Sequence, residues 1–130
     1  MEFIMQKICM GKDIGVHGNL FGGVMLSWID ESAGCLAARI CRNPNVVTIK
    51  IDEVIFKKPV KVGFIISIYG DIIRVGNTSI TLKIEARQTN VRTEEEAVVC
   101  STQTTFVNIN PSGEPIPIPA SVREKYIDKQ

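Results

Sequence analysis

The sequence predicts an α+β domain in which one antiparallel sheet of about five strands wraps around a single long helix. Hydrophobic residues recur at three- and four-residue steps between Gly22 and about Cys41, which is the period of a helix. Before and after that segment, the apolar residues form short runs or alternate with polar ones, as in strands. The chain has 130 residues, so we expect a single domain over residues 1–130.

The helix is bounded by clear signals at both ends. A pair of glycines, Gly22 and Gly23, opens the periodic segment, and Asn43-Pro44 follows it, where proline prevents continuation. A segment of about twenty residues is roughly 30 Å long as a helix. Apolar groups lie on most of its circumference, so we expect the helix to be largely enclosed by the rest of the domain.

Five segments have the pattern of strands and together predict the sheet. Their approximate ranges are 3–10, 47–56, 62–75, 78–87 and 97–109. The second should contain a bulge or bend near Asp52-Glu53, and residues 75–78 should form a tight hairpin. From about residue 110 to residue 130, the prolines predict an extended C-terminal tail. Long sheet edges of this kind invite pairing with a second copy of the chain.

Composition excludes several classes of function. The formal net charge is only +1, so nothing attracts the protein to nucleic acid or to an anionic membrane. No stretch is apolar enough to span a membrane and the first residues lack the features of a secretory signal, so we expect a cytoplasmic protein. The four cysteines have no metal-ligand spacing, which predicts free, buried thiols, no metal site and no cofactor.

Asp30 is the first candidate for chemistry because it lies in the middle of the enclosed helix. Its helical neighbours three and four residues away, Ser27 and Gly34 among them, include no cation that could form a local ion pair. A carboxylate in such surroundings suits the role of a general base. The alternative is that Asp30 and Glu31 form a solvated patch of the helix, and periodicity does not separate these two interpretations.

The helix start and the loop before it carry the other candidates. Gly22-Gly23 would let backbone N–H groups approach a bound atom at the positive helix end, as in an oxyanion hole, although paired glycines also serve as simple tight turns. His17 is the only imidazole in the chain, and it is either a functional group or an exposed loop residue. A loop from one chain and a helix from another could bring His17 and Asp30 together.

The segment Asp13–Gly23, followed by Met25 and Asp30, resembles the signature of the hotdog-fold acyl-CoA thioesterases, in particular the YciA-like group. That pattern is close to D-x-N-x-x-G-[DN]-x-[FH]-G-G, with an acidic residue seven positions after the last glycine. Further matches follow in the same order, at Phe56–Pro59 with Val62-Gly63, at Val75–Ser79 and at Phe106–Gly113. The resemblance therefore covers nearly the whole chain.

The resemblance implies a hotdog fold, a homodimer with two sites at its interface, and often a hexamer built as a trimer of dimers. It also implies hydrolysis of a fatty acyl-CoA thioester, with coenzyme A as part of the substrate. By position, Asp30 would be the general base or the nucleophile, and the N–H of Gly22 would hold the thioester oxygen. The residues that would contact the substrate and its CoA part are Asn19, Phe21, Gly23, Lys57, Lys58, Pro59, Arg74, Gly76, Asn77, Thr78 and Ser79.

The chain departs from the family pattern at two positions. Gly15 stands where the pattern carries its catalytic asparagine, and our hypothesis is that His17 from the partner chain replaces that amide. Asn77 stands where the turn usually carries a basic residue. Contacts to the CoA phosphates would then depend on Lys57, Lys58 or Arg74.

Two alternatives keep the fold and change the function. The first is an enoyl-CoA hydratase or dehydratase that uses His17 and Asp30, although the His-Phe-Pro-Gly type of sequence found in such enzymes is absent. The second is a non-catalytic acyl-CoA sensor, in which Gly15 marks a lost activity. In either enzyme, the accepted acyl length depends on side chains near the helix, such as Phe21, Met25, Trp28 and Phe64, whose orientations the sequence leaves open.

Overall fold

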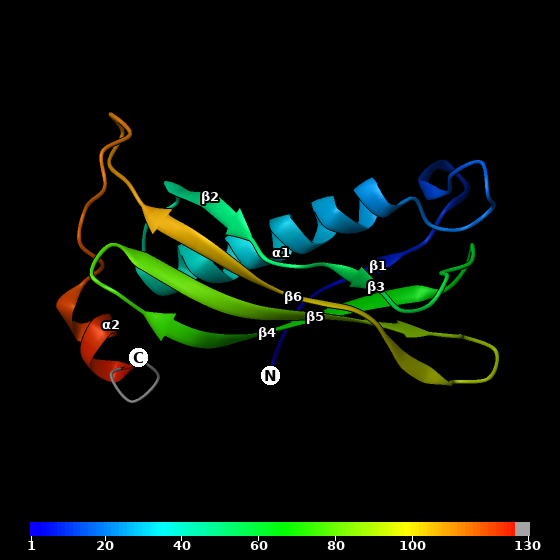
Figure 1. The fold of residues 1–130 in the computed structure, drawn as a ribbon. Helices are drawn as coiled ribbons and strands as arrows, with labels where there is room; N and C mark the ends of the chain where they lie inside the picture. Colours follow the sequence, from blue (N-terminus) through cyan, green and yellow to red (C-terminus); the bar gives the residue numbers. More distant parts are fainter. Residues whose placement is uncertain (127–130) are drawn as a thin grey trace.

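The computed structural model describes residues 1–126 and shows one long helix lying along a curled antiparallel sheet (Figure 1). The elements in chain order are β1 (Glu2–Ile8), the 3₁₀ turn η1 (Gly11–Asp13), α1 (Gly22–Cys41), β2 (Val46–Ile51), β3 (Ile55–Phe56), β4 (Ile65–Val75), β5 (Ser79–Thr89), β6 (Glu96–Asn108) and α2 (Ala120–Lys125). The sheet has the order β1-β4-β5-β6-β2, and the two-residue β3 also pairs with β6. The predicted fold class is confirmed, with β3 as a short sixth strand.

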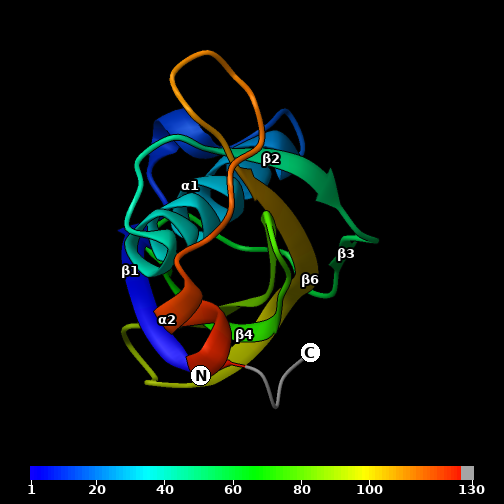
Figure 2. The same ribbon diagram turned by 90° about the vertical axis from the view of Figure 1, so that its left-hand side faces the viewer.

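The sheet encloses α1 on most sides. Figure 2 shows the strands curling from β1 through β4 and β6 to β2, with α1 inside the curve. The inward side chains of α1, such as Ile29 and Leu36, are buried against apolar residues of the sheet, such as Ile84. One stripe of α1 stays exposed at four-residue spacing and consists of Gly23, Ser27, Glu31, Cys35 and Arg39. The helix is therefore less completely enclosed than expected, because the curled sheet is open along one side.

Close contact between α1 and the sheet depends on Gly70 of β4. A Cβ atom added at this position would lie 2.7 Å from Ile4 Cδ1 and 2.8 Å from Leu36 Cδ2. Both distances are below van der Waals contact, so a side chain at this position would force the ends of the Ile4 and Leu36 side chains to shift. This packing fixes the position of α1 on the sheet.

The end of α1 is tied to the last strand and to the C-terminal tail by two asparagines. Asn43 donates hydrogen bonds from Nδ2 to Asn108 Oδ1 (2.7 Å) and to the carbonyl oxygen of Ile109 (2.9 Å). Asn108 is buried and donates in turn to the carbonyl oxygen of Pro117 (3.3 Å). Buried amides need such partners, and here they hold the tail against the domain.

The tail differs from the prediction of an extended segment that reaches residue 130. The helix α2 begins directly after Pro119, because the run of prolines ends there and the following residues can adopt helical conformation. Val122 of α2 is buried, which anchors the helix on the domain. The last part of the predicted tail, residues 127–130, lies outside the described residues.

The break expected near Asp52-Glu53 is present, and a second irregularity lies before it. The pairing of β2 with β6 shifts register between Thr48 and Lys50, and at residues 52–54 the chain leaves strand conformation altogether. The hairpin between β4 and β5 is confirmed, since the N–H of Gly76 donates to the carbonyl oxygen of Ser79 (2.8 Å).

Asp13 closes the 3₁₀ turn that leads into the loop before α1. Its side chain is buried, and Oδ2 accepts the backbone N–H of Met10 at 2.9 Å. This hydrogen bond, supported by Lys12 Nζ at 3.2 Å from Oδ1, lowers the pKa of Asp13 despite the opposing effect of burial. The ionised carboxylate therefore stabilises the folded chain.

We expect Asp13→Asn to lower the free energy of unfolding by about 1 kcal/mol at neutral pH, because the amide still accepts the N–H of Met10 but lacks the charge that strengthens this hydrogen bond. Because the folded pKa is depressed, the contribution of Asp13 is fully present above the usual aspartate pKa of about 3.9 and is lost as the pH falls through the lower, folded value. Urea unfolding should therefore show the difference between variant and wild type shrinking below about pH 4. Asp71→Asn, at an exposed aspartate, is the control, and an equal effect of both substitutions would contradict the assignment.

Candidate active site

A tight loop places His17 next to the start of α1. Ile14 and Leu20 form an isolated β-bridge at the base of the loop. Inside it, the N–H of Gly15 donates to the carbonyl oxygen of Asn19 (2.9 Å), and the N–H of Gly18 donates to that of Gly15 (3.0 Å). Gly18 has a φ of 82°, a conformation that glycine adopts without strain. These bonds close the loop, which fixes the position of His17.

The imidazole of His17 occupies the space beside Gly15. The backbone N–H of Asn19 donates to His17 Nδ1 at 3.1 Å, so in the neutral ring the proton lies on Nε2. A Cβ atom added at Gly15 would lie 3.1 Å from His17 Nε2 and 3.1 Å from Phe21 Cδ1. A side chain at position 15 and the imidazole in this orientation therefore compete for the same space.

The first turn of α1 presents backbone N–H groups that lack acceptors. The N–H groups of Val24 and Met25 both donate to the carbonyl oxygen of Phe21, at 3.0 and 3.2 Å. Within residues 1–126, no acceptor is found for the N–H groups of Gly22 and Gly23. Such groups at the positive end of a helix are suited to bind an oxygen with negative charge. This agrees with the predicted role of the helix start.

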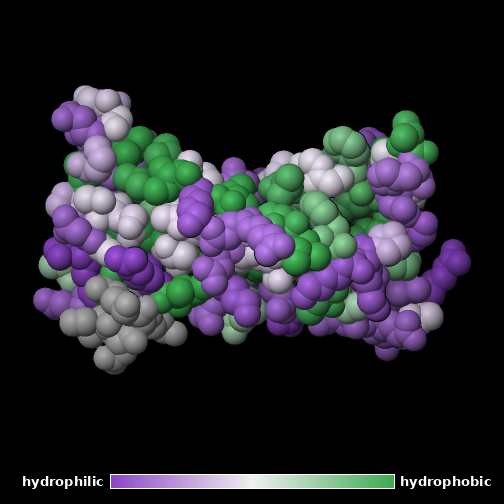
Figure 3. Space-filling view, viewed as in Figure 1, coloured by the Kyte–Doolittle hydropathy of each residue, from purple (hydrophilic) through white to green (hydrophobic). Residues whose placement is uncertain are grey.

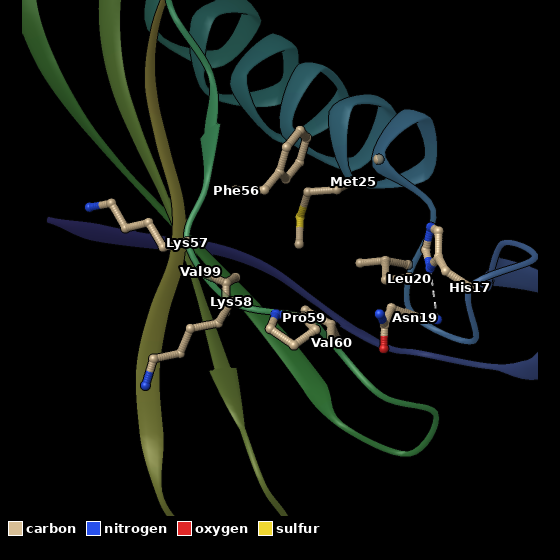
Figure 4. A pocket seen from close by; sticks show the side chains of 11 residues that line it. His17, Asn19, Leu20, Met25, Phe56, Lys57, Lys58, Pro59, Val60 and Val99 are labelled. Atoms are coloured by element: carbon tan, nitrogen blue, oxygen red, sulfur yellow. Dashed lines mark hydrogen bonds between the residues drawn. The ribbon is translucent and has the colours of Figure 1, made fainter.

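A cavity of about 340 Å³ opens beside Gly22 (Figure 4). It is lined by His17, Asn19, Leu20, Gly22, Met25, Phe56, Lys57, Lys58, Pro59, Val60 and Val99. Its inner part is apolar, with Met25, Val60 and Val99 each less than 5% exposed. Lys57 and Lys58 extend away from the cavity at its edge, as Figure 4 shows. The predicted residues His17, Asn19, Gly22, Lys57, Lys58 and Pro59 thus lie around one cavity.

Asp30 lies outside this cavity, farther along α1. It is half-buried, and its Oδ1 accepts a hydrogen bond from Thr48 Oγ1 of β2 at 2.7 Å. Gly22 and Asp30 are eight residues apart, which corresponds to about 12 Å along the helix axis. One protomer therefore does not bring Asp30 and the N–H of Gly22 to the same atom.

Thr48 is a site residue that sequence reasoning missed. It lies at the register shift of β2, where the regular alternation of side chains is interrupted. The signal available in the sequence was only a threonine in an alternating strand, which is common in sheets. Its pairing with Asp30 follows from the fold and not from any local motif.

Asp30 and Thr48 lie next to an open edge of the sheet. The strand β2 ends the sheet order, so within the described chain its outer side is unpaired. Five apolar side chains along β2 and β3 are exposed: Val47, Ile49, Ile51, Ile55 and Phe56. Figure 3 shows apolar surface along the face of the molecule that carries these two strands. An apolar, unpaired strand edge is typical of a surface that another chain covers.

The other predicted CoA contacts do not join the cavity within one protomer. Arg74 and the residues from Gly76 to Ser79 lie at the hairpin between β4 and β5, and Figure 1 shows this hairpin near α2, at the opposite end of the sheet from the loop before α1. The strand β4 has 11 residues, which corresponds to roughly 35 Å. The role of these residues in binding CoA stays a prediction.

The cysteines offer no activated thiol at the cavity. Burial raises the pKa of Cys41 to about 11 and is also the largest cause of the raised pKa values of Cys9 and Cys100. Cys35 is exposed, contrary to the expectation of a buried residue, because it lies on the open stripe of α1. Among residues 1–126, no group of three His, Cys, Asp or Glu side chains could hold a metal ion. Neither helix in that range has both the length and the apolar character needed to cross a membrane.

Comparison with known proteins gives consistent matches over most of the chain. The family model of the thioesterase superfamily matches residues 17–95. An uncharacterized acyl-CoA thioester hydrolase of Buchnera aphidicola is 36% identical over 83% of this chain and 80% of its own length. The acyl-CoA thioester hydrolase YciA of Salmonella typhimurium is 29% identical over 91% of this chain and 90% of its own.

A solved structure confirms the fold. The hexameric hotdog fold thioesterase of Campylobacter jejuni is 33% identical and superimposes with a TM-score of 0.88, covering 96% of both chains. The order of one strand, one long helix and a curled antiparallel sheet, together with these matches, shows that the chain belongs to the thioesterase superfamily and has the hotdog fold.

Proposed function

We propose that the protein hydrolyses acyl-CoA thioesters at a site shared between two copies of the chain. The observation that carries this proposal is the arrangement on α1, where unpaired N–H groups lie beside an apolar cavity and a carboxylate lies two turns later at an open sheet edge. The names of the Buchnera aphidicola and Salmonella typhimurium relatives support this reaction.

The first step is polarisation of the thioester carbonyl by the helix start. The carbonyl oxygen gains negative charge as the carbonyl carbon is attacked, and the N–H of Gly22 donates a hydrogen bond to it. Because this N–H has no partner in the described chain, it binds the oxygen without first breaking another bond. The positive end of α1 adds to the stabilisation of the charge.

Asp30 is the base or nucleophile of the reaction. The hydrogen bond from Thr48 orients the carboxylate through Oδ1, and within residues 1–126 Oδ2 has no partner and is free to act. In the general-base route, Oδ2 takes a proton from water, whose oxygen attacks the carbonyl carbon. The C–S bond then breaks, and Oδ2 returns the proton to the leaving thiolate, which gives CoA thiol and the free acid. In the alternative route, Oδ2 attacks the carbonyl carbon directly, the C–S bond breaks to release CoA thiolate, and water hydrolyses the resulting anhydride to the free acid and the regenerated carboxylate of Asp30.

A two-fold dimer along β2 would bring the two halves of the site together. The edge of β2 is apolar and unpaired, and Asp30 and Thr48 lie beside it. In an isologous dimer, both subunits use the same surface, so every contact across the interface occurs twice. The dimer therefore contains two equivalent sites. Gly22 and His17 of one subunit then face Asp30 of the partner subunit. The hexameric state of the Campylobacter jejuni relative supports further assembly into a trimer of dimers.

His17 replaces the amide that the family pattern carries at position 15. The Nε2–H of its neutral ring is a hydrogen-bond donor at the same cavity that Gly22 lines, which is the function of a side-chain amide. The absence of a side chain at Gly15 gives the ring its space. Lys57 and Lys58, both exposed at the cavity edge, supply positive charge for the phosphates of CoA.

We expect Asp30→Asn to lower the rate of thiol release by about 10² to 10⁴, the usual contribution of a general base. The measurement is thiol release from acyl-CoA, followed with a thiol-reactive dye and corrected for the cysteines of the protein. Glu31→Gln is a matched control, because it removes an adjacent carboxylate that is exposed on the open stripe. Full activity of Asp30→Asn would refute the assignment. Hydration of enoyl-CoA, or tight binding without turnover, by the wild-type protein would indicate one of the alternative functions.

We expect His17→Ala to lower kcat by about 10² to 10³, as for the loss of one oxyanion donor. Gly15→Asn alone should also be poorly active, because its side chain meets the imidazole, whereas Gly15→Asn combined with His17→Ala should recover much of the rate. Val16→Ala, at a fully exposed neighbour, is the control. Steady-state kinetics of the four variants test the exchange, and unchanged turnover by His17→Ala would show that the imidazole has no catalytic role.

We expect Asp30→Asn and His17→Ala subunits to complement each other in mixed dimers. A shared site combines His17 from one subunit with Asp30 from the other, so each mixed dimer contains one intact site and one with both defects. Co-expression with two different affinity tags, purification through both tags and a thiol-release assay measure the effect. Activity near half of the wild-type value is expected. Mixed dimers as inactive as the single variants would place each complete site within one subunit.

A further inference from the structure

We propose that Lys61 is a positioning residue for His17, which it holds in place through the side chain of Asn19. Lys61 Nζ donates a hydrogen bond to Asn19 Oδ1, and the backbone N–H of Asn19 donates in turn to His17 Nδ1. The inference rests on the proposed role of His17 in thioester hydrolysis. It extends that role to a residue that does not line the cavity.

The orientation of the imidazole depends on the backbone of Asn19. Its N–H donates to His17 Nδ1 at 3.1 Å, and its carbonyl oxygen accepts the N–H of Gly15 at 2.9 Å. The first of these bonds leaves the proton of the neutral ring on Nε2. If the peptide at Asn19 rotated, Nδ1 would lose its partner, and the ring would be free to turn or to adopt the other tautomer. The ring therefore offers Nε2–H as a donor only while Asn19 stays in place.

Packing does little to hold the tip of this loop. Residues 16–18, His17 among them, are exposed, so hydrogen bonds must fix their position. Among residues 15–19, the backbone hydrogen bonds and the bond to the imidazole all stay within the loop. Only the side chain of Asn19 is bonded to another segment of the described chain, and its partner there is Lys61. This contact connects the loop tip to the rest of the domain.

Lys61 itself stands on a rigid part of the backbone. A tight turn begins there, in which the N–H of Phe64 donates to the carbonyl oxygen of Lys61 at 3.1 Å. The turn is tied to the chain after β1 by two hydrogen bonds with Cys9, one from the N–H of Gly63 (2.8 Å) and one to the carbonyl oxygen of Phe64 (2.9 Å). Lys61 therefore provides a fixed point against which Asn19 is held.

A lysine suits this contact because an ammonium group can only donate hydrogen bonds. It requires the oxygen of the Asn19 amide and so determines which way the amide is turned. The charge strengthens the bond, although exposure to water limits its contribution. Within residues 1–126, the ammonium groups of Lys57 and Lys58 have no such partner, although both lie on the same segment. Lys61 thus has a different role from the two lysines assigned to the phosphates.

The first test is the ¹⁵N NMR spectrum of the imidazole, because His17 is the only histidine of the chain. The protein is labelled at histidine, carries no histidine tag, and is measured at a pH where the ring is neutral. The wild type should give two widely separated ring signals, as expected for a proton fixed on Nε2. Lys61→Met should move the two signals toward each other, because both tautomers become populated. Lys61→Arg keeps a charged donor and should restore the separation.

The second test is thiol release from acyl-CoA, which measures the consequence for the proposed reaction. Lys61→Met should lower kcat by about two- to fivefold, the scale of one exposed charged contact, with KM nearly unchanged. In a protein that already carries His17→Ala, Lys61→Met should lower kcat no further, because it acts only through the imidazole. Lys83→Met, at an exposed lysine of β5 away from the cavity, is the matched control for both tests.

The spectrum separates failure of this inference from failure of the proposed function. Convergence of the two signals in Lys61→Met, with recovery in Lys61→Arg, supports the inference even for a protein that hydrolyses no thioester. Signals that stay as in the wild type, or that move equally with Lys83→Met, overturn it. A rise in KM with an unchanged spectrum also overturns it, because Lys61 would then bind the substrate itself. Convergent signals with an unchanged kcat would support the positioning contact and refute the role of His17 in the reaction.

Discussion

The packing of α1 against the curled sheet determines where each reactive group of the protein lies. Close approach at Gly70, where the side chains of Leu36 and Ile4 meet β4, holds the helix against the sheet. The start of the helix then lies over the cavity, and the side chain of Asp30 points toward β2. A sheet that did not curl would leave these groups without the walls of the cavity and without Thr48. The packing of the core therefore also sets the geometry of the candidate site.

The elements were predictable where local patterns determine them. The helix begins at Gly22 and ends at Cys41, as the change of period and the flanking Gly22-Gly23 and Asn43-Pro44 indicated. The features of the structure that differ from the prediction all depend on contacts between segments that are distant in the sequence. The register shift at Thr48 arises in the pairing with β6, and α2 is anchored through burial of Val122. Neither contact leaves a local pattern in the sequence.

The candidate site likewise combines features that the sequence indicates with features that only the folded structure reveals. Family resemblance drew attention to Gly15 as a departure, and the loop geometry supplies a physical reason, since the imidazole of His17 leaves only a tight space for a side chain at that position. The cavity could not be predicted, because Met25 recurs at helical spacing like any core residue. Only the packed structure distinguishes a side chain that fills the core from one that ends at a void. Thr48 was missed for a related reason, because its partner lies on another element.

The distance between Gly22 and Asp30 ties assembly to catalysis in the proposed dimer. In this proposal, a single subunit supplies only one part of each site, either the helix start or Asp30. It also exposes an apolar strand edge, which promotes aggregation while it is uncovered. Pairing along β2 removes that edge from water and completes both sites in the same step. Loss of the interface would then cost stability and activity together, because in the proposed dimer the surface that holds the subunits together would also align Asp30 of the partner subunit with the helix start. Because Gly22 and Asp30 are held about 12 Å apart on one rigid helix, the proposed site needs a second copy of α1 to bring one of each to the same thioester.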